Sequence, residues 1–457
     1  MITVLGGGPA GAAASLLLAR LGHPVQLVTK AGRDQRLAVS LPPSCAKVFD
    51  ALGIAAAVDA AGFQRSTGNT AWWGSDQARV EYFADGARGW QLDVGRLADV
   101  ILAEAIAAGV QVDRRMATDA PGGFVLDCTG RAGIVARARG VRRLDGGPRT
   151  IALIGEWRHS SGWAVADHTH TLIESYRDGW MWSLPVGDGV RHVAAMVDPQ
   201  RSDLARAGSS THVYLAEVRK TRIFSGLTAE ATLQGGPWGW DATPYDATAY
   251  AGDDWLLVGD AGSFIDPLSS AGVKKALASG WLAAVTAHTC VKTPAMRTQA
   301  LAFFDARERE IASHMRRESR QFLGSAASGH GRPFWSERAA DLELESAASA
   351  SLREAFEALK RSNGWSPRVG PGVGIAPRPC VRDSLIVLEP HVVTAEHPNG
   401  IRYVRGVDLV ALLDLAPATR QVPEAYEIYL QRLGPTRLDD FLLAVATAVA
   451  GRWLVSE

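Results

Sequence analysis

The feature of this sequence that most limits its fold is a glycine-rich turn close to the N-terminus. Residues 2–5 form an apolar run that predicts a buried strand, and a helix of small side chains is predicted after the turn. Between them, residues 6–11 read GGGPAG and fit the pattern GxGxxG. In this pattern Gly6 permits the tight turn, Gly8 lets the backbone approach a pyrophosphate, and Gly11 allows the helix to pack on the strand. Residues 6–11 therefore predict a dinucleotide site at a helix N-terminus.

The turn alone does not distinguish FAD from NAD, and the position that usually contacts the ribose is atypical. Residues 25–28 predict the second strand of a βαβ unit with a parallel sheet. The carboxylate expected at the end of that strand is missing, because the position falls on Thr29 or Lys30. A threonine hydroxyl binds a ribose more weakly than a charged acceptor does. The residues predicted to contact the dinucleotide at this end are Gly6, Gly8, Pro9, Ala10, Gly11, Thr29 and Lys30.

The chain of 457 residues is too long for one compact core. We predict the α/β class, with a discontinuous, Rossmann-like nucleotide-binding domain formed by residues 1–149 and 250–295. Longer strand-like runs, four of them before residue 198, predict an inserted antiparallel-sheet substrate domain over residues 150–249. The C-terminal region is predicted to be mainly helical: residues 296–364 start with a long helix that ends near residue 323. Residues 365–457 predict a small α/β domain that begins with a Gly- and Pro-rich linker, residues 365–379.

Charge and cysteine content argue against several classes of partner. Lysine plus arginine total 48, as do aspartate plus glutamate, so no basic field is available for nucleic acid or an anionic membrane surface. No apolar stretch reaches the roughly 20 residues that a membrane span needs. The four cysteines lie far apart without metal-ligand spacing, which predicts no metal site and reduced thiols of a cytoplasmic protein. The N-terminus also lacks the basic region of a signal peptide.

A second motif decides the cofactor. An apolar strand at residues 255–258 runs into Gly259-Asp260, and Asp266-Pro267 and residues 269–273, SSAGV, follow at the head of a predicted helix. This segment resembles that of the group A flavin monooxygenases and flavin-dependent halogenases. The resemblance implies FAD as the cofactor, Asp260 on its ribitol or ribose, and a loop beside the isoalloxazine whose helix N-terminus stabilises reduced flavin. The residues implied to contact FAD here are Asp260, Pro267, Ala271, Gly272 and Val273.

Three further segments resemble the same families. Residues 91–97, QLDVGRL, are similar to a segment in which an arginine or its neighbours contact FAD, which implies this role for Arg96. Residues 127–131, DCTGR, resemble a turn beside the FAD pyrophosphate, and Gly130 is the position implied. Arg36 begins a stretch that resembles the loop lying beside the cofactor. The resemblance extends from residue 1 to about residue 335, and the tail from residue 365 resembles no family that we can name.

Residues 179–185, GWMWSLP, closely resemble the WxWxIP signature of flavin-dependent halogenases. In a strand Trp180 and Trp182 point to one face and make an apolar wall, which in the halogenases separates substrate from flavin. An ordinary sheet core of two indoles is the alternative. Together with Trp72 and Trp73, these residues are the predicted lining of a dry, aromatic substrate pocket.

Two departures argue against halogenation. Halogenases carry the active halogen on a lysine, but the corresponding stretch, residues 62–74, contains no lysine, and its arginine stays protonated and is a poor nucleophile. Tryptophan halogenases also place a glutamate where Ser269 stands. We therefore expect a monooxygenase that hydroxylates an electron-rich ring through a flavin hydroperoxide, which a dry pocket protects. The candidates for proton transfer are Asp266, His168 and His170.

Residues 320–323, RQFL, at the end of the long helix and residues 332–335, RPFW, resemble halogenase-like flavoproteins that mature tryptophylquinone enzymes, in particular the peptidyl tryptophan dihydroxylases. This similarity implies that the substrate is a tryptophan side chain of a protein or peptide, during biogenesis of a quinone cofactor. Molecular oxygen is the implied co-substrate, and reduced flavin comes from NAD(P)H directly or from a separate flavin reductase. Two alternatives stay open: an FAD oxidoreductase of small molecules that is similar to halogenases or geranylgeranyl reductases, and a non-catalytic flavin-binding interaction protein.

Overall fold

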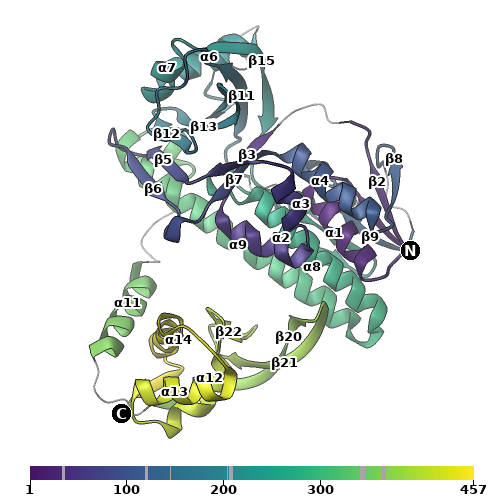
Figure 1. The fold of residues 1–457 in the computed structure, drawn as a ribbon, viewed down its shortest axis with the longest axis vertical. Coiled ribbons are helices and arrows are strands. Elements are labelled where there is room, and N and C mark those ends of the chain that lie inside the picture. Colours follow the sequence, from purple (N-terminus) through teal and green to yellow (C-terminus); the bar gives the residue numbers. More distant parts are fainter. Residues whose placement is uncertain are drawn as a thin grey trace. The chain divides into compact units, whose positions relative to one another are not determined.

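The computed structural model describes residues 1–32, 37–118, 122–144, 146–202, 204, 209–339, 346–361 and 367–456. The chain divides into two compact units, Met1–Ala340 and Asp341–Glu457 (Figure 1). Each unit has its own core of buried apolar side chains.

A six-stranded sheet forms the nucleotide-binding part of the first unit, with the strand order β17-β18-β9-β1-β2-β8. β1 (Ile2–Leu5) pairs in parallel with β2 (Val25–Thr29) and β9 (Phe124–Asp127), and β9 pairs in parallel with β18 (Trp255–Leu257). The edge strands are β8 (Gln111–Arg114) and β17 (Ala251–Gly252). Parallel pairing brings the carboxyl ends of β1, β2, β9 and β18 to one edge, where α/β folds bind their ligands. The predicted fold class is confirmed.

Three helices pack together beside this sheet: α1 (Pro9–Arg20), α4 (Val94–Ala107) and α8 (Gly272–Lys292). α1 follows β1 directly and contacts both of the other helices (Figure 1). Helices α1 and α8 approach closely, since a Cβ at Gly280 would lie 2.5 Å from the carbonyl oxygen of Ala10. The small side chains of these helices therefore let the N-terminus of α1 pack against the first half of α8.

The second sheet of this unit has seven strands in the order β15-β11-β14-β13-β12-β5-β6. The four strands predicted before residue 198 are confirmed as β11 (Ile151–Arg158), β12 (Thr171–Tyr176), β13 (Gly179–Gly187) and β14 (Val190–Val197). The sheet is not built from residues 150–249 alone, because β5 (Gly68–Trp72) pairs in parallel with β12 and continues to β6 (Arg79–Tyr82). The N-terminal part of the chain thus contributes two strands to the sheet predicted as an insert.

The long helix α9 (Arg297–His330) runs beside α8 and continues beyond residue 323, where its end was predicted. Its last turns contain glycine and serine, which usually favour a helix end. Gly329 is required for packing instead, because a Cβ there would lie 2.6 Å from the carbonyl oxygen of Gly74. The helix ends at Gly331, whose φ is +55°.

The first unit contains further strands and helices. Its strands are β3 (Ala38–Leu41), β4 (Gln64–Ser66), β7 (Gly89–Asp93), β10 (Arg142–Leu144), β15 (Thr232–Asp241) and β16 (Tyr245–Ala247). Its helices are α2 (Ala46–Leu52), α3 (Ala55–Ala60), α5 (Ile134–Ala138), α6 (Ser210–Lys220), α7 (Ile223–Thr228) and α10 (Pro333–Ser336).

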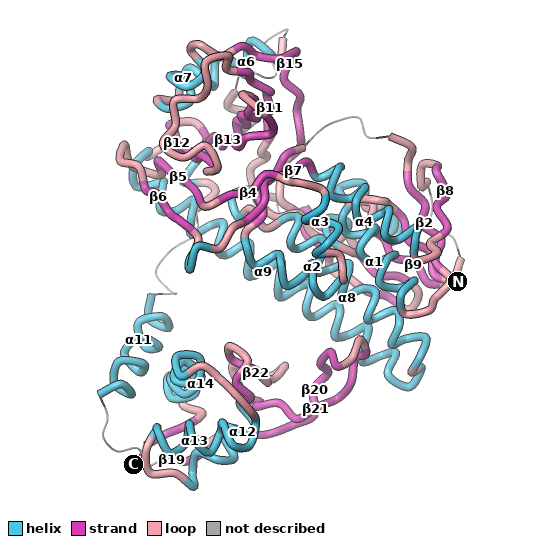
Figure 2. Tube along the Cα trace, in the orientation of Figure 1, coloured by secondary structure: helices cyan, strands magenta, loops and turns pink. Residues whose placement is uncertain are grey.

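The second unit has two features that differ from the sequence prediction. α11 (Ser346–Arg361) contributes Phe356 and Leu359 to the core of this unit, so the predicted helical region of residues 296–364 divides between the two units. The predicted linker, residues 365–379, contains the start of β20 (Gly374–Arg382), which forms a hairpin with β21 (Leu385–Val393) (Figure 2). Prolines are tolerated there because each strand of a two-stranded sheet has an unpaired edge.

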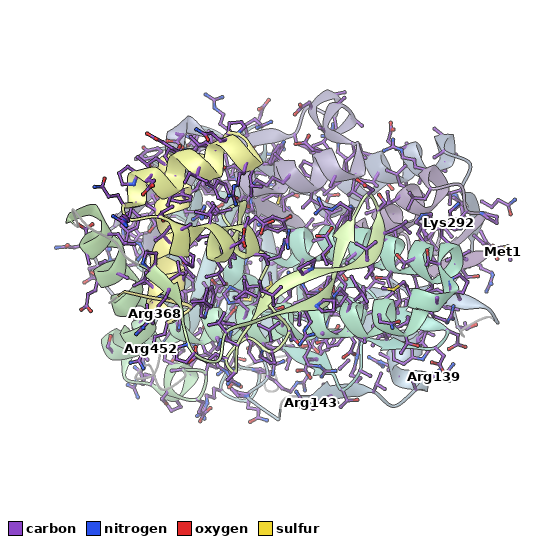
Figure 3. All side chains as sticks on the ribbon, turned by 90° about the horizontal axis from the view of Figure 1, so that it is seen from below. Met1, Arg139, Arg143, Lys292, Arg368 and Arg452 are labelled. Atoms are coloured by element: carbon purple, nitrogen blue, oxygen red, sulfur yellow. The ribbon has the colours of Figure 1, made fainter. Side chains whose placement is uncertain are left out.

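The other elements of this unit surround its core. They are β19 (Pro367–Val369), β22 (Tyr403–Val404), β23 (Val407–Asp408), β24 (Leu454–Ser456), α12 (Leu409–Leu415), α13 (Val422–Leu433) and α14 (Leu438–Ala450). β19 pairs with β24, and Arg368 and Arg452 accordingly lie close together (Figure 3). Within the described part of the chain, no helix combines the length and the apolar character that crossing a bilayer requires.

Candidate functional site

One large cavity in the first unit connects the two sheets. Its volume is about 1910 Å³, and it extends from the glycine turn after β1 to one face of the seven-stranded sheet. Small-molecule sites usually measure roughly 300–1,000 Å³. The cavity therefore has room for a dinucleotide and a second ligand. We call its two parts the dinucleotide end, near residues 6–9, and the aromatic end, near Trp180 and Trp182.

The dinucleotide end is formed by the N-terminus of α1. No side chain caps this helix, and the N-cap residue, Gly8, lines the cavity together with Pro9. A Cβ placed on Gly8 would meet no protein atom within 4 Å. The uncapped N–H groups and the open approach at Gly8 fit the pyrophosphate of a dinucleotide, which the helix dipole also favours. The residues present therefore fit FAD.

The other glycines of the turn have a structural role. A Cβ on Gly6 would lie 2.3 Å from the carbonyl oxygen of Cys128, and one on Gly11 would lie 1.8 Å from the carbonyl oxygen of Gly6. Gly7 donates its N–H to Oγ1 of Thr29 at 3.1 Å. Thr29, at the position of the usual ribose acid, thus holds the glycine turn while still lining the cavity.

The dipeptide Gly259-Asp260 lies at the end of β18, opposite the glycine turn. The side chain of Asp260 is 32% exposed and lines the cavity, and burial raises its pKa above the ordinary value. Lys275, only 1% exposed, lies 3.6 Å from Oδ1 of Asp260 and donates to the carbonyl oxygen of Gly259 at 3.1 Å. A lysine in the first turns of α8 therefore fixes the backbone and the carboxylate of this dipeptide, a role that the sequence motif did not reveal.

The DCTGR turn after β9 is held by its own aspartate. Asp127 accepts hydrogen bonds from the N–H of Thr129 at 3.0 Å and from the N–H of Val135 at 2.7 Å. This arrangement places Gly130, with φ +62°, on the cavity wall.

The cavity brings together most of the residues predicted to contact FAD. Those that line it are Gly6, Gly8, Pro9, Thr29, Lys30, Arg96, Gly130, Asp260, Pro267, Gly272 and Val273. Ala10, Gly11 and Ala271 do not line it. Gly11 packs α1 on β1 instead, and Arg36 falls outside the described residues. The guanidinium of Arg96 lies 5.0 Å from the ring centre of Phe63 at the cavity rim. Direct contact of each residue with FAD stays a prediction.

Asp266 is a buried carboxyl on the cavity wall. It lines the wall beside Pro267 and Leu268, and its Oδ1 accepts a hydrogen bond from the N–H of Leu268 at 3.0 Å. Burial raises the pKa of Asp266 to about 6. A carboxyl with this pKa exchanges a proton near neutral pH, as general acids and bases do.

The aromatic end uses one face of the seven-stranded sheet. Trp180 and Trp182, two residues apart on β13, both line the cavity as predicted. Trp180 is 2% exposed and packs edge-to-face against Trp73, with ring centres 6.2 Å apart. Trp72 and Trp73 were predicted to line the pocket, but neither does. Trp72 packs on the core of the opposite sheet face, and Trp73 supports Trp180 while donating its N–H to the carbonyl oxygen of Phe322 at 2.8 Å.

The two histidine candidates lie outside the cavity. His170 is fully buried, its Nδ1 lies 2.9 Å from the hydroxyl of Thr70, and its Nε2 lies 3.4 Å from the carboxylate of Asp167. The backbone carbonyl of His168 accepts a hydrogen bond from buried Arg191. Both residues belong to the segment before β12, whose hydrogen bonds order the turn. The structure therefore places neither histidine on the cavity wall, and their role in proton transfer stays a prediction.

The structure reveals a polar pair in the cavity that the sequence did not indicate. Glu156 on β11 and His192 on β14 stand opposite each other in the strand register, with Oε2 and Nε2 3.3 Å apart. Both line the cavity. One signal in the sequence could have indicated Glu156. Side chains alternate along a strand, so Ala152, Ile154 and Glu156 on β11 share the face that lines the cavity. Predicting the pair would also have required the register with β14.

Halogenases carry the active halogen on a lysine, so the lysines that line the cavity bear on the type of reaction. Among the described residues that line the cavity, Lys30 is the single lysine, and it lies at the dinucleotide end next to Thr29.

Comparison with known proteins agrees with the geometry of the dinucleotide end. Residues 1–122 match the family described as FAD binding domain. A tryptophan 2-halogenase from Chondromyces crocatus is 30% identical over 330 residues, which cover 64% of this chain and 61% of that relative. The chain thus spans about three fifths of the length of this curated relative.

Two solved structures share the fold along nearly the whole chain. The flavin-dependent halogenase CmlS superposes with a TM-score of 0.80 at 19% identity, covering 100% of this chain and 95% of that one. The peptidyl tryptophan dihydroxylase QhpG superposes with a TM-score of 0.68 at 23% identity, covering 98% of each chain. The chain therefore has FAD as its cofactor and is similar to flavin-dependent halogenases in sequence and in fold.

Proposed function

We propose that this chain is an FAD-dependent oxidoreductase that oxidises an electron-rich aromatic ring. The observation that carries the proposal is the single cavity that joins the glycine turn to the wall of Trp180 and Trp182. Apolar walls with few polar groups are typical of sites for aromatic ligands. A ring placed against the two indoles lies in the same enclosure as the cofactor.

The residues of the chain have separate tasks in this proposal. The N-terminus of α1 binds the pyrophosphate, and Lys275 holds Asp260 where it meets the sugar part of the cofactor. FAD, once reduced, supplies the electrons that activate molecular oxygen. Trp180 and Trp182 exclude water from the ring, and Asp266, with its pKa of about 6, holds or releases a proton at its carboxyl.

Two reactions fit this site, and different observations support them. The curated relative named a tryptophan 2-halogenase supports halogen transfer to a small aromatic molecule. The absence of a lysine from the described lining of the aromatic end supports oxygen transfer, that is, hydroxylation. In both reactions oxygen is a co-substrate, and we propose that a separate flavin reductase supplies the electrons.

A tryptophan side chain within a protein is the second candidate substrate. The similarity to a peptidyl tryptophan dihydroxylase along nearly the whole chain supports this substrate. The size of the cavity supports it too, because the cavity is larger than a dinucleotide alone requires. Biogenesis of a tryptophylquinone cofactor is the corresponding process, and it would need a protein partner.

Mass spectrometry of the products tests the proposal. The full chain, loaded with FAD and supplied with a flavin reductase and NADH, is incubated with 3-methylindole, 4-methylphenol or a tryptophan-containing peptide, with and without chloride and bromide. A mass gain of a halogen atom indicates halogenation, and a halide-independent gain of oxygen indicates hydroxylation. If the loaded protein consumes oxygen but modifies none of these rings, the proposal of aromatic oxidation is wrong.

A further inference from the structure

We infer that Glu156 binds a ring-borne N–H or O–H of the aromatic substrate, and that His192 positions Glu156 for this contact. The inference rests on the proposed function, because it requires an aromatic ring at the aromatic end. It assigns the chemical class of that ring: an indole, a phenol or another aromatic with a hydrogen-bond donor on the ring.

The strand register places the pair at the aromatic end. Glu156 stands opposite His192, and His192 in turn stands opposite Leu184 on β13. Trp182 and Ile154 occupy the next cavity-facing positions on β13 and β11. Two residues along a strand span about 7 Å, which is close to the length of a bicyclic aromatic ring. A ring against Trp182 therefore has its far edge near the carboxylate of Glu156.

The positioning residue of the pair is buried, and the residue that binds the ligand is open to the cavity. His192 is 2% exposed and packs edge-to-face against Trp238, with ring centres 5.4 Å apart. The side chain of Glu156 is 32% exposed and is open to the cavity. The fixed imidazole thus orients the carboxylate, while the carboxylate keeps an accessible acceptor. A carboxylate has about four lone-pair sites, so the contact with His192 leaves acceptors for a ligand.

The surroundings favour a neutral donor over a cation. Arg158 is the next cavity-facing residue of β11 beyond Glu156, and its charge is offset by that of Asp188, whose backbone oxygen it contacts and which also lines the cavity. On the inner side the carboxylate faces Ile154, Leu184 and Trp182, which are apolar apart from one indole N–H. Hydrogen bonds to charged acceptors in such surroundings are stronger than those between neutral groups. An indole N–H or a phenol O–H is the donor that suits this position.

Binding of two indoles that differ only in the donor tests the inference. 3-Methylindole carries the ring N–H, and 1,3-dimethylindole replaces it with a methyl group. Their dissociation constants are measured by calorimetry on the full chain loaded with oxidised FAD, which separates binding from turnover. We expect the native protein to prefer 3-methylindole by about tenfold or more, since a hydrogen bond to a charged group has this effect.

The variants Glu156→Leu and His192→Phe distinguish recognition from general damage to the pocket. Damage weakens both ligands together, whereas loss of the acceptor changes their ratio. We expect Glu156→Leu to abolish the preference and His192→Phe to reduce it by about threefold, as expected when a neighbour of the acceptor is lost. The matched control is Glu81→Leu, the same substitution on β6 of the same sheet at a carboxylate that does not line the cavity. It should keep the preference of the native protein.

The outcomes separate this inference from the proposed function. An unchanged preference in Glu156→Leu, or equal binding of both indoles to the native protein, would overturn the role of Glu156 and leave aromatic oxidation standing. Binding of neither indole to the FAD-loaded native protein would overturn the aromatic substrate class and the inference with it.

Discussion

The two ends of the cavity are built by different means. At the dinucleotide end the contacts come from backbone: a helix N-terminus without a capping side chain and a glycine whose missing side chain leaves space. At the aromatic end they come from side chains on β11, β13 and β14, which meet only through strand pairing. Backbone contacts require glycine at fixed spacing, so they leave a motif in the sequence. Side-chain contacts across a sheet leave only an alternation.

This difference implies that mutations at the two ends damage the protein in different ways. At the aromatic end a truncated side chain leaves a void in a packed wall. At the dinucleotide end an added side chain either collides with backbone or fills the space meant for the cofactor. The following predictions use this contrast, from the largest expected effect to the smallest.

Trp180→Ala should cause the largest loss of stability, because the indole is 2% exposed and packs against Trp73. Removing a buried aromatic side chain lowers the free energy of unfolding by about 3–5 kcal/mol. Trp182→Ala is the matched control: that indole also lines the cavity but is only partly buried, so its loss should cost clearly less. Chemical denaturation of the three proteins measures the effect. If both variants lost the same free energy of unfolding, the packing of Trp180 against Trp73 would not contribute to stability.

Gly11→Ala tests the packing of α1 against β1, which depends on a glycine at this position of the turn. The new methyl group would lie 1.8 Å from the carbonyl oxygen of Gly6, and backbone cannot move away from it without separating α1 from β1. We expect a loss of about 3 kcal/mol, the upper part of the range for overpacking, together with loss of FAD. Normal thermal stability in this variant would contradict the close approach of helix and strand.

Asp266→Asn tests the buried carboxyl on the cavity wall. The folded-state pKa of about 6 lies above the ordinary 3.8, so the folded chain binds this proton more tightly than the unfolded chain. Stability from this group is therefore complete at low pH and is lost as the pH rises from about 4 to about 6. The variant should be more stable than the native protein by about 3 kcal/mol at pH 7.5, and the difference should be small at pH 4. Melting curves without ligand at both pH values measure this difference, and a larger gain at pH 4 would refute the assignment.

Gly8→Ala should have the smallest effect on the fold and a selective effect on the cofactor. Its φ of −72° suits alanine, and the added Cβ meets no protein atom within 4 Å. Thermal stability without FAD should therefore match that of the native protein. FAD affinity should fall by about tenfold, roughly 1.4 kcal/mol, because the methyl group lies where the pyrophosphate approaches. Flavin fluorescence titration measures the affinity, and unaltered binding would place the phosphates elsewhere.

The sequence predicted the parts of the molecule that local chemistry specifies. Gly6, Gly8, Asp260 and the two tryptophans of β13 all line the cavity, while their contacts with cofactor and substrate stay predictions. Thr29 was recognised as an atypical ribose position, and the structure adds that it accepts the N–H of Gly7.

What the sequence did not predict depends on contacts between distant segments. Glu156 and His192 meet because β11 and β14 share a register, and Trp73 turns from the cavity because α9 extends to meet the loop after β5. His170 was a reasonable proton carrier by residue type, yet Thr70 on β5 holds it in the sheet. Such contacts follow from strand order, which no local pattern encodes.

The position of β18 beside β9 also has a consequence for the order in which the protein folds during synthesis. The N-terminal strands β1, β2 and β9 are complete after residue 127, but Asp260 and α8, which close the cofactor site, come after the whole seven-stranded sheet has been made. At roughly 5–20 residues per second, a ribosome needs about 7 to 27 seconds to add the segment between Asp127 and Asp260. The nascent chain therefore has an incomplete cofactor site for that time, and the site can close around FAD only after the strands of the aromatic end have been synthesised.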